Sequence, residues 1–238
     1  MKIFEGFKEY ILLNEGVYDK GIFKAIFTAG GPGSGKSFIV EKTLEGHGLK
    51  TVTSDAFFEY LLERQGMSKD LDSMSPEDYE KAMTIRKHAK SLTTKQFSLY
   101  LDGRLGIVID GTGRDFDKIK RTADVLKYLG YDTTMVFVNT TLDVALKRNA
   151  ERERSISSEV VKQSWLDAQE NIGKFQNYFG LENFIVVDNS ETITQSNKEE
   201  IEAIFTKVFK EIKKILSKNI NNPIAKLWIS NELKSKKR

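Results

Sequence analysis

The chain has 238 residues, a formal net charge of +3 and no cysteine, which suits one domain with extensions and excludes disulfides and thiolate metal sites. It has no apolar run long enough to span a membrane and no secretory signal, so we expect a cytoplasmic protein. Residues 219–238 carry a local charge of +4, which leaves −1 for the rest. A body without a global basic surface lacks the electrostatic footprint of a duplex-binding protein, so a polynucleotide would need a local groove.

Residues 1–15 precede the first predicted strand. Phe4, Phe7 and Ile11 recur at helical spacing, which predicts a short amphipathic helix. Leu13-Asn14-Glu15 followed by Gly16 is similar to the cleavage sites of capsid-targeting peptides on internal head proteins of tailed bacteriophages. The resemblance implies a phage protein packaged in the capsid through residues 1–15, whereas the simpler reading is a helix that packs on the domain.

The next element carries the clearest motif. A β-prone run at 23–29 leads into Gly30-Gly31-Pro32-Gly33-Ser34-Gly35-Lys36-Ser37, and a helix is predicted from Phe38 onward. A glycine-rich turn between a strand and a helix is the context of a phosphate-binding P-loop, whose backbone N–H groups and helix N-terminus converge on phosphate oxygens. We therefore predict ATP binding by Gly31, Pro32, Gly33, Ser34, Gly35, Lys36 and Ser37, with Lys36 on the β- and γ-phosphates and Ser37 on Mg²⁺.

Strands and helices then alternate to the end of the chain. Strands are predicted at 49–53, 105–110, 133–138 and 183–188, and helices at 56–62, 76–101, 116–129, 142–154, 158–179 and 201–216. This order predicts an α/β fold, a five-stranded parallel sheet with helices on both faces, of the P-loop nucleotide-kinase type. We expect an N-terminal extension at 1–21, a kinase domain at 22–217 and a basic C-terminal tail at 218–238.

Polar residues follow four of these strands. The segments at these strand ends are the P-loop, Ser54-Asp55, Asp110-Gly111-Thr112 and Asp188-Asn189. Because ligands of such sheets bind beyond the carboxyl ends of the strands, this edge is the predicted active site, and Asn189 is a predicted nucleotide contact.

Several of these side chains suit phosphoryl transfer. Asp55 is placed to act as general base, although it could instead cap the next helix, and Asp110 suits an outer-shell contact to Mg²⁺. Arg148, Arg152 and Arg154 precede a short break between helices and suit a lid over the phosphates, although three exposed arginines can also be merely solvated.

Two further arginines are candidates for binding the acceptor. Arg114 follows the third strand, and Arg86 lies on the long helix that should wall the acceptor side. An anionic acceptor would explain these cations by charge-assisted hydrogen bonds, whereas a solvated helix face would explain Arg86 without function.

Taken together, residues 30–37, Thr53-Ser54-Asp55, residues 108–114 and Ala145-Leu146-Lys147-Arg148-Asn149 resemble the zeta-toxin and polynucleotide 5′-kinase group of P-loop kinases. The resemblance covers about residues 22 to 190. It implies Asp55 as general base, Lys36 and a lid arginine on the transferred phosphoryl group, and Ser37 on Mg²⁺. Polynucleotide kinases place an arginine where this chain has Phe58, which weakens the case for a nucleic-acid substrate.

The leading hypothesis is an ATP-dependent, Mg²⁺-requiring kinase that phosphorylates a hydroxyl of a nucleotide, a nucleotide-sugar or a 5′-hydroxyl nucleic acid. A rival hypothesis is a packaged nucleotide-binding phage protein with vestigial catalysis. A third is a nucleoside monophosphate kinase, which shares the architecture and differs mainly in its acceptor pocket.

Overall fold

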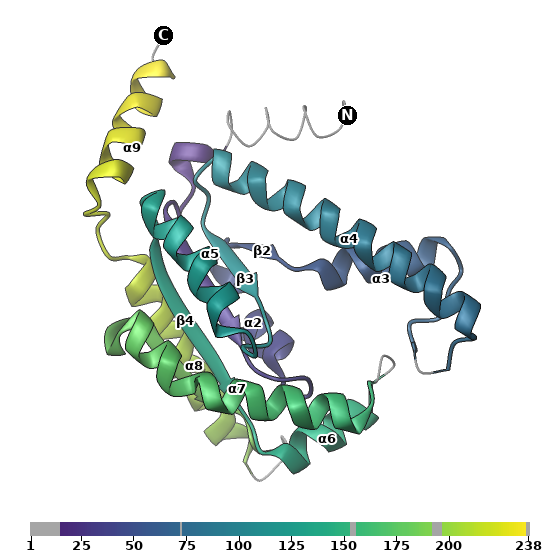
Figure 1. The fold of residues 1–238 in the computed structure, drawn as a ribbon. Coiled ribbons are helices and arrows are strands. Elements are labelled where there is room, and N and C mark those ends of the chain that lie inside the picture. The colour runs from purple at the N-terminus through teal and green to yellow at the C-terminus, as the bar shows by residue number, and fades with distance from the viewer. Residues whose placement is uncertain (1–14, 72, 153–155, 192–196, 237–238) are drawn as a thin grey trace.

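The computed structural model describes residues 15–71, 73–152, 156–191 and 197–236. Its centre is a five-stranded parallel sheet with the strand order β2-β3-β1-β4-β5 (Figure 1). The strands are β1 (Lys24–Ala29), β2 (Lys50–Val52), β3 (Ile107–Asp110), β4 (Asp132–Asn139) and β5 (Phe184–Asp188). The predicted α/β fold and its five strands are confirmed.

Helices connect the strands and cover both faces of the sheet. They are α2 (Lys36–Thr43), α3 (Ser54–Arg64), α4 (Pro76–Asp102), α5 (Phe116–Tyr128), α6 (Leu142–Ala150), α7 (Ser158–Phe179), α8 (Lys198–Leu216) and α9 (Pro223–Ser235). Short 3₁₀ turns lie at η1 (Gly16–Tyr18), η2 (Glu45–His47) and η3 (Leu181–Asn183). No helix in these described ranges is long and apolar enough to cross a bilayer.

The central strand β1 is buried along its whole length. Side chains of a strand alternate between faces, so Phe27 enters the core under α5 and α7, and Ile26 enters the core under α2 and α8. Strands covered on both faces read as continuous apolar runs, which is why the sequence predicts them well. Packing on both faces holds the carboxyl ends of the strands, and the loops that follow them, in fixed positions.

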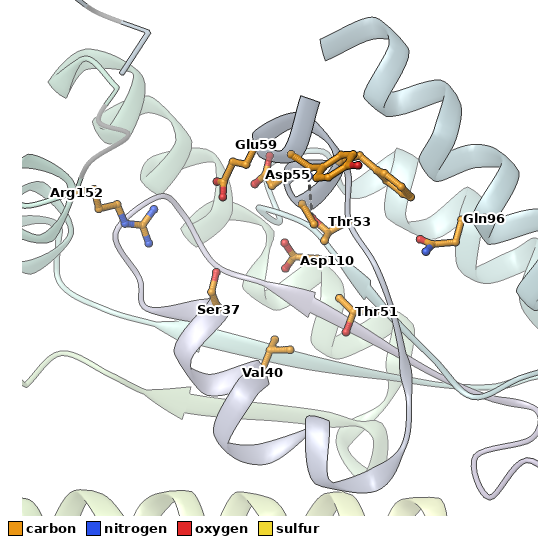
Figure 2. A pocket seen from close by; sticks show the side chains of 12 residues that line it. Ser37, Val40, Thr51, Thr53, Asp55, Glu59, Gln96, Asp110 and Arg152 are labelled. Atoms are coloured by element: carbon orange, nitrogen blue, oxygen red, sulfur yellow. Dashed lines mark hydrogen bonds between the residues drawn. The ribbon is translucent and has the colours of Figure 1, made fainter. Parts of the chain in front are cut away.

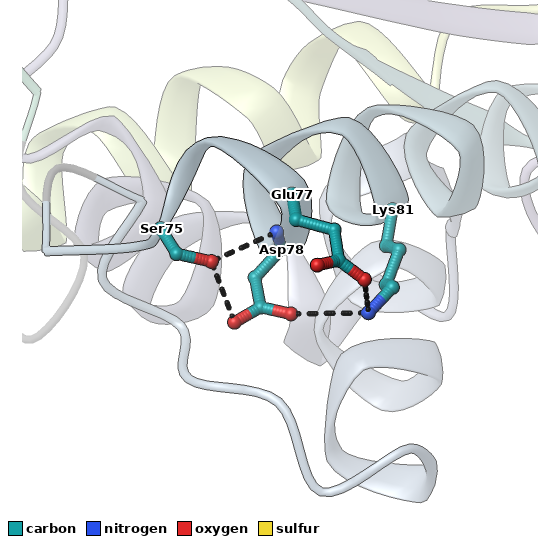
Figure 3. Close-up of polar contacts among 4 residues, drawn as sticks. All are labelled: Ser75, Glu77, Asp78 and Lys81. Carbon is teal, nitrogen blue, oxygen red and sulfur yellow. Dashed lines mark hydrogen bonds and ion pairs between the residues drawn. The ribbon is translucent and has the colours of Figure 1, made fainter.

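Helices α3 and α4 form a hairpin that extends beyond β2 at one side of the sheet (Figure 1). The hairpin has an apolar cluster of its own, in which Phe58 and Leu62 of α3 pack on Ala82, Ile85 and Ala89 of α4. The start of α4 is well defined because Ser75 Oγ accepts a hydrogen bond from the Asp78 backbone N–H and donates one to the Asp78 carboxylate (Figure 3). Lys81 adds ion pairs to Glu77 and Asp78 one turn later.

Residues 223–235, within the predicted basic C-terminal tail, form helix α9. Its Ala225 is fully buried. The half-buried Trp228 ring packs edge-on against the Phe23 ring, with the ring centroids 5.6 Å apart. The Arg104 guanidinium lies over the same indole at 5.9 Å. Pro223 does not interrupt this helix, because it occupies the first turn of α9, where a helix tolerates proline.

This packing predicts that α9 stabilises the domain. Trp228→Ala should lower the free energy of unfolding by about 2 kcal/mol, less than the roughly 3–5 kcal/mol of a fully buried aromatic side chain, because Trp228 is half-buried. Leu227→Ala removes an exposed neighbour on the same helix and should stay within about 0.5 kcal/mol of wild type. Urea unfolding of both variants measures the difference, and equal stabilities would show that α9 is not part of the cooperative unit.

Candidate functional site

The loop between β1 and α2 has the backbone geometry of a phosphate cradle. Gly33 and Gly35 adopt φ angles of +78° and +79°, which disfavour any residue with a Cβ. A Cβ on Gly33 would lie 2.1 Å from the Ala145 carbonyl oxygen, and one on Gly35 would lie 2.2 Å from Asn189 Nδ2. No side chain caps the first turn of α2, which begins at Lys36, so its N-terminus is available to an anion.

Lys36 and Asp110 meet at the centre of this edge. Lys36 Nζ donates to Asp110 Oδ1 at 2.6 Å, and the Thr28 hydroxyl donates to the same oxygen at 2.8 Å. Thr28 lies on β1 and Asp110 on β3, and the two residues are register partners in the sheet. The sheet therefore fixes the Asp110 carboxylate, which orients the Lys36 ammonium group above the P-loop.

The residues at this edge suit a Mg²⁺ ion. Ser37 and Asp110 line one cavity and offer a hydroxyl and a carboxylate, and oxygen ligands are what Mg²⁺ prefers. Kinase sites hold Mg²⁺ through one or two protein oxygens together with phosphate oxygens, which matches this donor set. The roles of Ser37 and Asp110 in metal binding remain predictions.

Asn189 holds the P-loop in place from the end of β5. The buried side-chain amide of Asn189 donates a hydrogen bond to the Ser34 carbonyl oxygen at 2.7 Å. The backbone carbonyl oxygen of Asn189 accepts a hydrogen bond from the Arg148 guanidinium at 2.8 Å. Arg148 also donates to the Glu191 carbonyl oxygen at 2.8 Å, and burial lowers the pKa of its guanidinium. In this structure, both residues are committed to supporting the loop, so their predicted roles in nucleotide contact and catalysis remain predictions.

Asp55 faces a cavity of about 800 Å³ that it shares with Ser37, Asp110 and Arg152 (Figure 2). It lies in the first turn of α3, which begins two residues earlier than expected. The helix cap is Thr53, whose hydroxyl oxygen accepts a bond from the Asp55 backbone N–H at 3.3 Å. Asp55 is therefore not the N-cap of this helix, and its side chain lies among the groups predicted for phosphoryl transfer.

A second cavity of about 720 Å³ is lined in part by residues of α4 and α5. It shares Thr53 and Asp110 with the first cavity. Arg114 lines it, together with Lys90 of α4 and Lys118 of α5. None of these three cations forms an ion pair with a described residue. Cations from three separate segments thus converge on a cavity next to Asp110, where they would favour an anionic ligand.

The other predicted arginines lie elsewhere. The Arg86 guanidinium stacks over the Phe58 ring at 5.3 Å and lines neither cavity, whereas Arg152 lines the first one. Arg154 lies outside the described residues. The predicted break between α6 and α7 is present, and the Asn149 side chain bonds to both backbone groups of Ile156 across it, at 2.7 and 3.3 Å.

The first cavity also contains residues that sequence reasoning missed, namely Thr51, Phe57, Glu59, Tyr60 and Gln96. Glu59 lies one helical turn after Asp55, so the spacing i, i+4 could have indicated it. Gln96 could not have been found in this way, because it reaches the cavity only through the packing of α4 on α3 and β2.

These features define a P-loop nucleotide-binding protein with a kinase-like fold. Residues 26–174 match the family model described as an AAA domain, and the chain belongs to this family. No curated protein sequence matches the chain.

Solved structures show the same fold. One, from the PezAT chromosomal toxin–antitoxin system of Streptococcus pneumoniae, matches with a TM-score of 0.57 and 16% identity over 88% of this chain and 96% of the other. Another, the AvrRxo1-ORF1:-ORF2 complex with ATP, matches with a TM-score of 0.57 and 12% identity over 97% of this chain and 88% of the other. At these identities the likeness concerns the fold alone.

The close contacts of the P-loop predict a sharp difference between two glycine substitutions. Gly33→Ala should abolish ATP binding and lower stability, because its Cβ would collide with the Ala145 carbonyl group at a positive φ. Gly173→Ala should leave ATP binding unchanged and raise stability by about 0.5–1 kcal/mol, because Gly173 is exposed within α7 and has open space around it. Calorimetric titration with ATP and thermal unfolding test both, and normal ATP affinity in Gly33→Ala would contradict this geometry.

Proposed function

We propose that this protein is an ATP-dependent kinase that transfers the γ-phosphoryl group to a hydroxyl of a nucleotide-type acceptor. The observation that carries the proposal is that Ser37, Asp55, Asp110 and Arg152, from four separate segments, line one cavity. A phosphate cradle, a carboxylate for the acceptor proton and a cation for developing charge are the parts that phosphoryl transfer requires.

In this mechanism the acceptor hydroxyl attacks the γ-phosphorus of ATP while the bond to the β-phosphate oxygen breaks. Asp55 accepts the hydroxyl proton, so that ADP and a phosphate ester leave. Lys36 and Arg152 stabilise the negative charge on the transferred group. Ser37 and Asp110 would hold Mg²⁺, which would neutralise part of the phosphate charge. The P-loop and the sheet supply positioning, which is the larger part of catalysis in this reaction class.

The acceptor is proposed to carry a negative charge. Arg114, Lys90 and Lys118 support this, because they line the second cavity without an ion-pair partner among the described residues. A nucleotide, a nucleotide-sugar or a 5′-hydroxyl nucleic acid would each supply a phosphate for these cations. A nucleoside monophosphate kinase would use the same charges, and the phosphorylated product distinguishes it.

The rival hypothesis of vestigial catalysis finds less support. That hypothesis predicts that the Asp55 side chain is the N-cap of α3. Instead, Thr53 caps α3 and Asp55 faces the cavity. The proposed packaging in a phage capsid through residues 1–15 is a separate prediction. Residues 1–14 lie outside the described residues, and neither solved structure compared above bears on this prediction.

Asp55→Asn should lower phosphoryl transfer by about a hundredfold or more, the usual scale for loss of a general base, and leave ATP affinity near wild type. Lys36→Ala should also remove transfer. The assay follows label from γ-³²P-ATP to 5′-hydroxyl oligonucleotides, nucleosides, nucleoside monophosphates and UDP-sugars.

Glu59→Gln is the matched control, because Glu59 lines the same cavity one turn later on α3. If Glu59→Gln abolished transfer and Asp55→Asn did not, the general base would have been assigned to the wrong carboxylate. ATP binding without label on any acceptor would instead favour the inert nucleotide-binding module.

The two candidate acceptor arginines should behave differently. Arg114→Ala should raise the acceptor KM by about tenfold with little change in ATP affinity, because Arg114 lines the second cavity, to which none of residues 30–37 contributes. Arg86→Ala should lower the free energy of unfolding by about 0.5–1 kcal/mol, because it loses the contact with the Phe58 ring, and should leave KM unchanged. Steady-state kinetics and urea unfolding separate the two effects, and a raised KM in Arg86→Ala alone would reverse the assignment.

A further inference from the structure

One part of the first cavity has no role in the proposed transfer step. Ser37, Asp55, Asp110 and Arg152 account for its catalytic end. Its remaining walls include Val40 of α2, Thr51 of β2, Phe57 and Tyr60 of α3, and Gln96 of α4. Figure 2 shows Thr51 and Gln96 together at one side of the cavity, away from Arg152.

Two aromatic side chains of α3 line this part of the cavity. Phe57 and Tyr60 are three residues apart on α3, so they lie on the same face of the helix, directly after Asp55. Tyr60 is 55% exposed although it lines a cavity, and Phe57 is only partly buried against the hairpin cluster. Aromatic area left open inside a cavity is typical of a surface that a flat ligand covers.

A polar edge borders this aromatic surface. The Gln96 amide carries a donor and an acceptor side by side, and Thr51 adds a hydroxyl. Neither side chain forms a hydrogen bond with a described residue, although both line the cavity. A glutamine amide can pair with the adjacent donor and acceptor atoms of a nucleobase edge, as it does with adenine in nucleic-acid complexes.

We propose that this part of the cavity binds a nucleobase of the acceptor. The base stacks on Tyr60 and Phe57, Val40 borders its other side, and Gln96 and Thr51 contact its polar edge. The inference rests on the proposed function and narrows the acceptor class to nucleosides and nucleotides, rather than sugars or other alcohols. It also makes Tyr60 a specificity-determining residue.

The position of Asp55 indicates which of the two substrates carries this base. Asp55 belongs to the same turn of α3 as Phe57, whereas Ser37, at the end of the P-loop, lines the cavity from the start of α2. A ring on the α3 side therefore belongs to the molecule whose hydroxyl faces Asp55. The sugar would lie at Thr53 and Asp110, where the two cavities meet, and a phosphate on it could reach the cations of the second cavity.

The test is a binding measurement that does not depend on catalysis. The full chain, saturated with a non-hydrolysable ATP analogue and Mg²⁺, is titrated by calorimetry with adenosine, guanosine, cytidine and uridine, and separately with ribose. At least one nucleoside should bind about tenfold more tightly than ribose, the scale of one base stacked on one aromatic ring. Tyr60→Leu should remove that difference, and Tyr60→Phe, which keeps the ring, should restore it.

Tyr79→Leu is the matched control, because Tyr79 is a similarly exposed tyrosine on α4 that lines neither cavity. The proposal is overturned if no nucleoside binds better than ribose, if Tyr60→Leu and Tyr79→Leu behave alike, or if Tyr60→Leu weakens the ATP analogue instead. Failure of the proposed kinase function has a different signature, which is nucleoside binding without transfer of label to any acceptor.

Discussion

The close approach of two glycines to neighbouring backbone and side-chain atoms is the constraint on which the site depends. Gly33 packs against the carbonyl group of Ala145 on α6, and Gly35 packs against the amide of Asn189 at the end of β5. Any side chain at either position would force these segments apart. The P-loop is therefore a packed part of the fold, which reduces the entropy that must be lost when phosphate binds.

This packing also links the P-loop to α6. Arg148 donates to the carbonyl oxygen of Asn189, whose side chain holds Ser34, so α6 and the P-loop share one hydrogen-bond chain. Arg152 lies two residues beyond the end of α6 and lines the cavity. In the proposed mechanism Arg152 must keep its position relative to the phosphate cradle, and the contacts of Arg148 hold the neighbouring end of α6 to that cradle.

The sequence predicts the fold closely because its signals are local. Strands such as β4 are buried apolar runs, and the start of α4 is indicated by Ser75 and Pro76. The same reasoning placed Asp55 and Asp110 at one edge, since the carboxyl ends of parallel strands meet there. Helix α9 was not predicted, because the side chains that hold it, such as Phe23, are distant in sequence.

The acceptor side was less predictable, for a related reason. Which side of a long helix faces a cavity depends on a rotation that the pattern of α4 does not fix, and Arg86 faces Phe58. The residues missed in the first cavity share this property. Tyr60 and Gln96 come together only because α3 and α4 pack as a hairpin against the edge of the sheet.

The hairpin and the main sheet carry different parts of the proposed site. The phosphate cradle and Asp110 are held by the main sheet, whereas Tyr60 and Gln96 are held by α3 and α4, whose apolar cluster around Phe58 and Leu62 is distinct from the two cores of the sheet. We therefore expect substitutions on the cavity side of the hairpin to change the proposed acceptor surface without disturbing the P-loop. Asp55 is the exception, since it lies on the hairpin but in the proposed mechanism would act next to the P-loop. Its position at the first turn of α3, directly after β2, keeps it close to the sheet, while residues of α3 as far as Tyr60 line the cavity.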